Sequence, residues 1–294
     1  MPALLCFGMG FCAEALALGR RAAGWRILGT VRSAERIREL AGRGFEACTL
    51  DAVEASGMLA ESGLHLVVSA PPTDQGDPVL AALGPRLQAA SRNIAWAGYL
   101  STTGVYGDHQ GGWVDEDTPV QPLSDRTRRR VEAEQAWLAW GKEAHVPVNV
   151  FRLAGIYGPG RNQLVSLREG TARRIMKKGQ VFSRIHVDDI ASVLEAAMER
   201  KPPSRIFNVC DDEPAPPQEV VAYAAGLLGI APPPLEEYEA ERANLSPMAA
   251  GFYQESKRVR NERIKQELGV RLAWPTYREG LSGLLRTLDK AGPA

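Results

Sequence analysis

The stretch that most constrains the fold lies at the start of the chain, between residues 4 and 19. An apolar run is followed by the turn Gly8-Met9-Gly10-Phe11-Cys12-Ala13, and then by a helical pattern. This G-x-G-x-x-A spacing is typical of a strand–turn–helix unit that binds a dinucleotide, although a plain tight turn is the alternative. Gly8 would allow the tight turn. Gly10 has no Cβ atom, so backbone N–H groups at Phe11 and Cys12 could approach a pyrophosphate.

The next strand indicates which dinucleotide the chain would bind. Residues 25–33 read as this strand, and it ends in Arg32, where an NAD site usually offers an Asp or Glu to the ribose 2′-hydroxyl. A guanidinium would bind a 2′-phosphate that a carboxylate would repel, and Thr30 and Ser33 could add hydroxyl donors. We therefore expect NADP rather than NAD. The alternative is an exposed arginine at a strand end.

Composition excludes several classes of partner. The 35 basic and 35 acidic side chains cancel, so no broad field would attract nucleic acid or an anionic membrane. The basic run at residues 126–130 is followed by Glu132 and Glu134, and we interpret it as a solvated helix face. With 294 residues the chain can bury a large core.

The cysteines and the chain start indicate a reducing compartment. The four cysteines form no C-x-x-C pair and no histidine stands at metal-ligand spacing, so we expect no metal site. We do not expect the N-terminal stretch to be a signal peptide, and no apolar run reaches 18 residues. A cytoplasmic location is the expectation.

Strands and helices alternate through the first half of the chain. After the two strands above, apolar runs predict four more, at residues 45–51, 64–70, 94–101 and 146–153. Helical patterns fill the gaps, for example at residues 78–90 and 128–141. This alternation predicts an α/β fold with a Rossmann-type, doubly wound parallel sheet.

Ligands of such sheets bind at the carboxyl ends of the strands. We expect a cofactor crevice there, lined by Ala70-Pro71-Pro72, by Ser101-Thr102-Thr103 and by Gly155-Ile156-Tyr157. Asp51, at the end of the third predicted strand, is a further expected cofactor contact.

The pattern becomes irregular after Gly160. A helix is predicted at residues 186–200, a strand at 204–210 and a helix at 217–228, before a proline-marked loop at 232–247. We predict a dinucleotide-binding domain of residues 1–160, to which residues 186–212 return. Residues 161–185 and 213–294 would form a smaller C-terminal substrate lobe.

Several segments, in order along the chain, resemble the extended short-chain dehydrogenase/reductases, the NAD(P)-dependent epimerase/dehydratase family. They are Ser101–Gly107, Arg152 with Ile156–Gly160, Ile185–Ala191, Phe207–Val209 with Asp211–Pro214, and Leu268–Leu281. The resemblance covers almost the whole chain. It implies a Rossmann domain with a C-terminal substrate lobe and small-molecule substrates, commonly nucleotide sugars or other carbonyl or hydroxyl compounds. Members of the family are often homodimers.

The family's chemistry uses a Ser or Thr that holds the substrate oxygen, a Tyr that transfers the proton, and a Lys four positions later. Thr102 matches the hydroxyl position. We do not find the Tyr-x-x-x-Lys motif, because no tyrosine lies between Tyr106 and Tyr157 and no lysine precedes Lys142. The chain therefore resembles an atypical subgroup of the family.

The resemblance places Arg126 at the Tyr position and Arg130 at the Lys position. An arginine cannot replace the tyrosine, because its pKa exceeds about 12 and it has no acceptor. Arg130 could still hydrogen-bond a ribose hydroxyl or a substrate phosphate. Tyr106 and Tyr157 lie near the expected crevice and are the alternative phenols for proton transfer, if an arginine lowers the pKa.

Two functions follow from these residues. The first is an NADP-dependent oxidoreductase or epimerase with an atypical active site, in which Thr102, Tyr106 and Arg130 act and Tyr157 contacts the cofactor. The second is a non-catalytic NADP(H)-binding regulatory or scaffold protein, which the missing Tyr and Lys favour.

Overall fold

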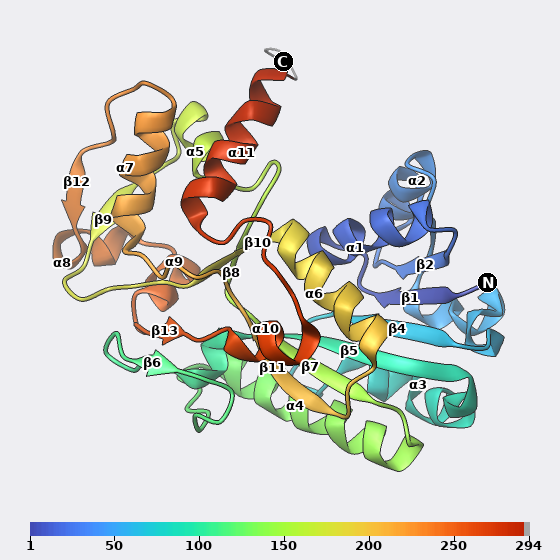
Figure 1. Cartoon of the computed structure of the whole chain (residues 1–294). Helices are drawn as coiled ribbons and strands as arrows, with labels where there is room; N and C mark the ends of the chain where they lie inside the picture. Colours follow the sequence, from blue (N-terminus) through green and yellow to red (C-terminus); the bar gives the residue numbers. More distant parts are fainter. Residues whose placement is uncertain (291–294) are drawn as a thin grey trace.

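The centre of the molecule is a parallel sheet of seven strands, in the order β11-β7-β5-β4-β1-β2-β3 (Figure 1). The computed structural model describes residues 1–290, with the backbone alone for residues 247–249 and 288–290. The strands are β1 (Ala3–Phe7), β2 (Arg26–Thr30), β3 (Glu46–Cys48), β4 (Leu64–Val68), β5 (Ile94–Thr102), β7 (Val148–Leu153) and β11 (Arg205–Val209). This arrangement confirms the predicted α/β class and the doubly wound sheet.

Helices cover both faces of the sheet and bury its strands. One face carries α1 (Phe11–Ala22), α2 (Ala34–Gly42) and α6 (Val187–Arg200), and the other carries α3 (Pro78–Ala89) and α4 (Asp125–Ala144). Every residue of β1, β4 and β7 is buried. Strands covered on both faces need apolar residues on both sides, which explains their nearly continuous apolar runs.

A smaller lobe stands at the carboxyl ends of the strands, at the upper left of Figure 1. Its elements are α5 (Gln163–Arg168), β9 (Arg174–Met176), α7 (Pro217–Leu227), β12 (Leu235–Glu237), α8 (Tyr238–Glu241), α9 (Pro247–Phe252) and α11 (Tyr277–Lys290). It has its own apolar core, in which Tyr157, Leu164, Val220, Tyr277 and Leu281 pack together.

Two pairs of short strands and one helix join the lobe to the sheet. β8 (Gly155–Tyr157) pairs with β10 (Arg184–His186), and β6 (Trp113–Val114) pairs with β13 (Arg258–Val259). α10 (Glu262–Leu268) packs against α6 and β11. The chain therefore passes between the sheet and the lobe more than once.

The predicted helix at residues 128–141 begins earlier than expected, at Asp125. The reason is a capping box, in which Thr127 N–H donates to Ser124 Oγ over 3.2 Å and Ser124 N–H donates to Thr127 Oγ1 over 3.1 Å. The cap satisfies backbone donors of the first turn.

Two other segments also differ from prediction. The third strand is shorter than residues 45–51, because short 3₁₀ turns follow β3 from Leu50 onward. The predicted loop at residues 232–247 contains β12 and α8. The strand expected at residues 204–210 does return to the main sheet, as β11 beside β7. The division into two domains stays a prediction, and residues 291–294 of the predicted lobe lie outside the described residues.

Candidate functional site

The glycine turn between β1 and α1 has the geometry that its spacing predicts. Gly8 has a φ of +92°, and a Cβ atom there would lie 2.8 Å from Ser69 Oγ and 3.0 Å from the Ala70 nitrogen. Its N–H donates to Thr30 Oγ1 over 2.9 Å. A Cβ atom on Gly10 would meet nothing within 4 Å. Gly8 is therefore needed for the turn itself, whereas the space above Gly10 is open to a ligand.

The start of α1 differs from the starts of the next five helices, although α7, α8 and α10 also begin without a side-chain cap. The N-termini of α2 to α6 are each capped by a side chain, from Ser33, Asp77, Ser124, Asn162 and His186. No side chain caps α1 at Gly10. The first N–H groups of a helix have no acceptor within the helix, and the helix dipole is positive there. These residues therefore fit the pyrophosphate of a dinucleotide.

Arg32 is the available cation at the end of β2. It is exposed and has no acidic partner among residues 1–290, whereas the nearby Arg36 pairs with Glu14 and Glu39. The expectation that Thr30 faces a 2′-phosphate is wrong, because Thr30 is buried and its hydroxyl oxygen accepts the Gly8 N–H. Ser33 caps α2 by accepting the Arg36 N–H over 3.3 Å.

Three other expected cofactor contacts lie at the carboxyl ends of β3 and β4. Asp51 is exposed, and a hydrogen bond from Thr49 lowers the pKa of its carboxyl group. The Ala70 N–H donates to the Phe7 carbonyl over 3.0 Å, and Pro71 is exposed. Their contacts with a cofactor stay predictions.

A cavity of about 1310 Å³ lies between the carboxyl ends of the strands and the lobe. It begins at the glycine turn, passes the end of β5 and reaches the lobe residues 251–255. The predicted site residues on its wall are Gly10, Phe11, Cys12, Ser101, Thr102, Arg130 and Tyr157. The predicted residues outside it are Gly8, Arg32, Asp51, Ala70, Pro71 and Tyr106. The structure thus brings the turn and the predicted hydroxyl together in one space.

The two hydroxyls at the end of β5 differ in what they can offer. Ser101 is buried, and its hydroxyl donates to Glu134, whose carboxylate also pairs with Arg152 at 2.7 Å. Thr102 Oγ1 accepts the Gly104 N–H over 3.1 Å. Because this bond uses the oxygen as an acceptor, the Thr102 proton stays free to be donated into the cavity.

The expectation that Tyr106 transfers a proton is wrong. Its side chain is fully buried, and its hydroxyl donates to Asn208 Oδ1 over 2.7 Å. Burial raises the pKa of Tyr106 to about 12, even though the Arg152 guanidinium lies 4.8 Å from its ring centre. The phenol therefore packs in the core and does not line the cavity.

Tyr157 lies on the cavity wall but is also largely buried. Its hydroxyl points at α11, since a Cβ atom on Gly280 would lie 2.1 Å from it. Burial raises the pKa of this phenol, and the nearby Asp211 and Asp189 carboxylates raise it further. Tyr157 thus packs the lobe against the sheet, and its contact with a cofactor stays a prediction.

The arginine run at the start of α4 is divided between two environments. Arg128 is exposed and pairs with Asp125, as a solvated face requires. Arg126 and Arg130 instead line the cavity, because residues four apart share one face of a helix. Arg130 Nη1 donates to the Leu100 carbonyl over 2.9 Å and to the Tyr99 hydroxyl over 3.1 Å. The interpretation of the whole run as a solvated face is corrected accordingly.

The structure adds two cavity residues that the sequence reasoning missed, Glu255 and Lys257. Lys257 is buried, and its Nζ donates to the Gly107 carbonyl over 3.0 Å and to the Glu255 carboxylate. A Cβ atom on Gly104 would lie 3.3 Å from Thr102 Oγ1 and 3.5 Å from Glu255 Oε1. The Glu255 carboxylate and the Thr102 hydroxyl therefore border the same small space.

A sequence signal for Lys257 did exist. Tyr253 and Lys257 have the Tyr-x-x-x-Lys spacing, outside the segment between Tyr106 and Tyr157 where the family's motif is expected. The spacing does not reproduce the family's arrangement, because α9 ends at Phe252 and β13 begins at Arg258. No helix carries the two side chains.

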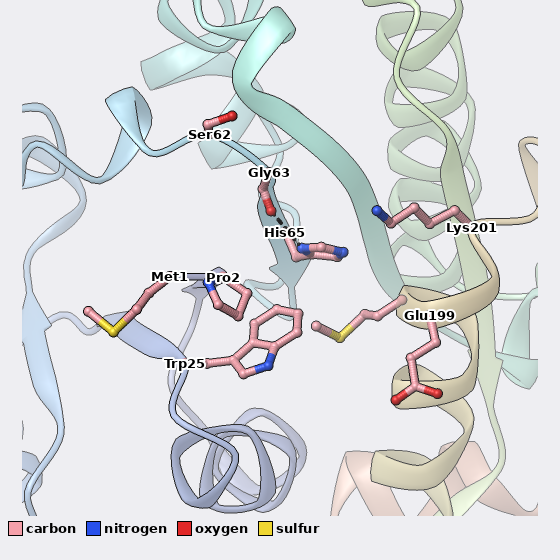
Figure 2. A pocket seen from close by; sticks show the side chains of 9 residues that line it. Met1, Pro2, Trp25, Ser62, Gly63, His65, Glu199 and Lys201 are labelled. Carbon is pink, nitrogen blue, oxygen red and sulfur yellow. Dashed lines mark hydrogen bonds between the residues drawn. The ribbon is translucent and has the colours of Figure 1, made fainter.

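A second cavity, of about 520 Å³, lies at the opposite, amino ends of the strands. Figure 2 shows His65 and Trp25 as neighbours in its wall, and their rings are in edge-to-face contact with centres 5.0 Å apart. Nδ1 of His65 lies 2.9 Å from the Gly63 carbonyl oxygen. Burial lowers the pKa of His65 to about 4, so the imidazole is neutral at pH 7.

Two negative findings apply to residues 1–290. No helix in that range is long and apolar enough to cross a membrane. Nor does that range bring three or more His, Cys, Asp or Glu side chains together in a way that could hold a metal ion.

Comparisons with known proteins agree with this fold. Residues 86–210 match the model of the NAD dependent epimerase/dehydratase family. A solved structure from Silicibacter pomeroyi DSS, described as a functionally unknown conserved protein, is 51% identical with a TM-score of 0.90. It covers 98% of this chain, which covers 99% of it.

Two curated proteins are also similar. Protein YeeZ of Escherichia coli (strain K12) is 26% identical over 79% of this chain and 86% of its own length. A 3-diazoavenalumate denitrifying reductase of a Streptomyces species is 32% identical over 57% of this chain and 58% of its own length.

Proposed function

Because residues 86–210 match the model of the NAD dependent epimerase/dehydratase family, we propose that this chain is an NADP(H)-dependent oxidoreductase or epimerase with a rearranged proton-transfer site. One observation carries the proposal. A single cavity runs from the uncapped start of α1, past the Thr102 hydroxyl, to the lobe. Such a cavity can hold a cofactor and a small-molecule substrate side by side. The similarity to a protein named as a reductase supports redox chemistry.

The preference for NADP rests on the end of β2. Arg32 is exposed there without an acidic partner in the described part of the chain. A guanidinium forms charge-assisted, often bidentate hydrogen bonds with a phosphate, and NAD has no 2′-phosphate to receive them. When bound, the cofactor would supply or take up the hydride.

The residues of this chain would manage the oxygen and the proton. Thr102 would donate its free hydroxyl proton in a hydrogen bond to the substrate oxygen. In the oxidative direction, the Glu255 carboxylate would accept the proton of the substrate hydroxyl as the carbon loses its hydride to the cofactor. Lys257, buried against Glu255 and Gly107, would hold that carboxylate in position. In the reductive direction the protonated Glu255 would return the proton.

The first test addresses the cofactor. Arg32→Ala should weaken NADPH binding about 10- to 100-fold, because a charge-assisted hydrogen bond contributes ~1.5–3 kcal/mol. Binding of NADH should change little. Calorimetric titrations with both cofactors measure this, and Arg38→Ala, which removes another exposed arginine from α2, is the matched control. Equal losses for NADPH and NADH would contradict the 2′-phosphate assignment.

A second candidate function is a non-catalytic NADP(H)-binding protein. The observation that favours it is the presence of Arg126 and Arg130 on α4, where the family's Tyr and Lys are expected. The two candidates differ in turnover. An NADPH absorbance change that depends on a carbonyl substrate and is lost in Glu255→Gln would support the enzyme. Tight NADPH binding without turnover across a panel of carbonyl compounds would support the binding protein.

A further inference from the structure

We propose that Arg126 and Arg130 form an anion clamp beside Thr102, and that the substrate carries a carboxylate or a phosphate close to its reacting carbon. This inference rests on the proposed function and specifies its substrate class. Both guanidinium groups line the cavity from the first turns of α4. Neither has an acidic partner within the described residues, so their charges are available to a ligand.

The clamp is placed by the backbone at the end of β5. Arg130 Nη1 donates to the Leu100 carbonyl over 2.9 Å and to the Tyr99 hydroxyl over 3.1 Å. The guanidinium of Arg130 is thus fixed to the backbone of Leu100, two residues before Thr102. Its remaining N–H groups can bind an anion. Arg126 lies one turn earlier on the same face, nearer to solvent. A ligand acid group held between them would keep the rest of the ligand next to the Thr102 hydroxyl.

The position of Arg126, the second residue of α4, is itself unfavourable for folding. The first turns of a helix carry the positive end of its dipole and favour anions, not cations. Asp125 offsets this for Arg128, with which it pairs, but it does not pair with Arg126 or Arg130. A bound anion would compensate both the helix dipole and the two unpaired charges. The local electrostatics therefore fit a bound acid group better than an empty cavity.

The clamp is separate from the cations that would meet the cofactor. Arg161, also on the cavity wall, lies with its guanidinium 5.9 Å from the centre of the Phe11 ring, at the glycine turn. It is therefore placed for the cofactor pyrophosphate. The Glu255 carboxylate does not neutralise the clamp, because it is paired with Lys257. Arg184, the fourth arginine on the wall, donates to the Phe182 and Ala215 carbonyls. Arg126 and Arg130 thus remain beside Thr102 for the substrate.

Anion titration of the NADPH-saturated protein tests the clamp. Inorganic phosphate and malonate are titrated separately by calorimetry at constant ionic strength, so that the cofactor fills its own phosphate sites. Arg126→Gln/Arg130→Gln should weaken binding of at least one anion about 10-fold or more, since charge-assisted hydrogen bonds are lost. Arg128→Gln/Arg129→Gln removes the same net charge from the same helix and should change binding by less than about twofold.

A single variant guards against a folding defect. Arg130 makes hydrogen bonds to the protein. Arg126 is exposed and its side chain has no hydrogen-bond partner among residues 1–290, so Arg126→Gln should fold normally. It should still weaken anion binding. A response to phosphate alone would identify a phosphate ester, and a response to malonate alone would identify a carboxylic acid.

Two results would overturn the clamp. One is NADPH binding with no binding of either anion. The other is anion binding that falls equally in the clamp variant and in the Arg128/Arg129 control. A failure to bind NADPH would instead refute the proposed function, and the same titrations without cofactor would then decide on the clamp alone.

Discussion

The two ends of the central sheet carry cavities of opposite character. The cavity at the carboxyl ends is about 1310 Å³ in volume and is lined by hydroxyls, arginines and the Glu255–Lys257 pair. The cavity at the amino ends is about 520 Å³, and its wall combines Trp25, Met198 and the neutral His65 with the charged Glu199 and Lys201 (Figure 2). The difference follows from parallel topology. Covering helices direct their N-termini, with free N–H groups, towards the carboxyl ends and their C-termini towards the other end.

The largest expected effect is a loss of stability on breaking the buried ion pair between Glu134 and Arg152, near the carboxyl-end cavity. Glu134→Ala would leave Arg152 buried and unpaired, since the two side chains are 3% and 5% exposed. We expect a loss of about 3–5 kcal/mol in the free energy of unfolding, measured by urea denaturation. Asp125→Ala, which removes an exposed pair with Arg128, should cost about 1 kcal/mol or less. Similar losses in both variants would show that this end of the sheet needs no buried ion pair.

The glycine turn gives the next largest effect. Gly8→Ala adds a Cβ atom within 3.0 Å of the chain after β4 and strains a φ of +92°, so it should cost about 3 kcal/mol and abolish NADPH binding. Gly57→Ala has similar strain at a φ of +71° but open space, and should cost about 1 kcal/mol. Denaturation and NADPH titration measure both. Unchanged NADPH affinity in Gly8→Ala would argue against the turn as the cofactor site.

The smallest expected effect concerns His65 in the amino-end cavity, which should make the stability of the fold depend on pH. His65 has its pKa lowered to about 4 from an ordinary 6.5, so it stabilises the fold above pH 6.5. That stability is lost as the pH falls towards 4. Between pH 7 and pH 5 the loss amounts to about 2 kcal/mol, which His65→Gln should abolish.

Urea denaturation at the two pH values compares His65→Gln with His145→Gln, which alters an exposed histidine. Only the first variant should flatten the pH dependence. If the free energy of unfolding fell equally between pH 7 and pH 5 in the unmodified protein and in both variants, His65 would not be held neutral by its surroundings.

What the sequence predicted well was local. Gly8 and Gly10 belong to one strand–turn–helix unit, in which spacing alone sets the geometry. The contact of Arg32 with a cofactor stays a prediction. Tyr106 was misplaced because the 3₁₀ turn Thr103–Tyr106 directs its ring into the core, although it stands only four residues after Thr102. The direction of a side chain after such a turn is set by tertiary packing, which a residue pattern does not contain.

Glu255 and Lys257 illustrate a second limit. They reach Thr102 from the far end of the chain, so no local spacing links them to it. The arginine run lies between these cases. The helical period places Arg126 and Arg130 on one face of α4 and Arg128 on another. Only the folded structure shows which of these faces lines the cavity.

The pairing of β6 with β13 has a consequence for how the protein is made. It joins Trp113 to Arg258, and thereby holds the segment with Glu255 and Lys257 against the end of β5. A ribosome releases the glycine turn, β5 and Thr102 long before this segment. We therefore expect a nascent chain to gain its cofactor platform first and its proton-handling pair last, so that it can bind a dinucleotide before it can use one.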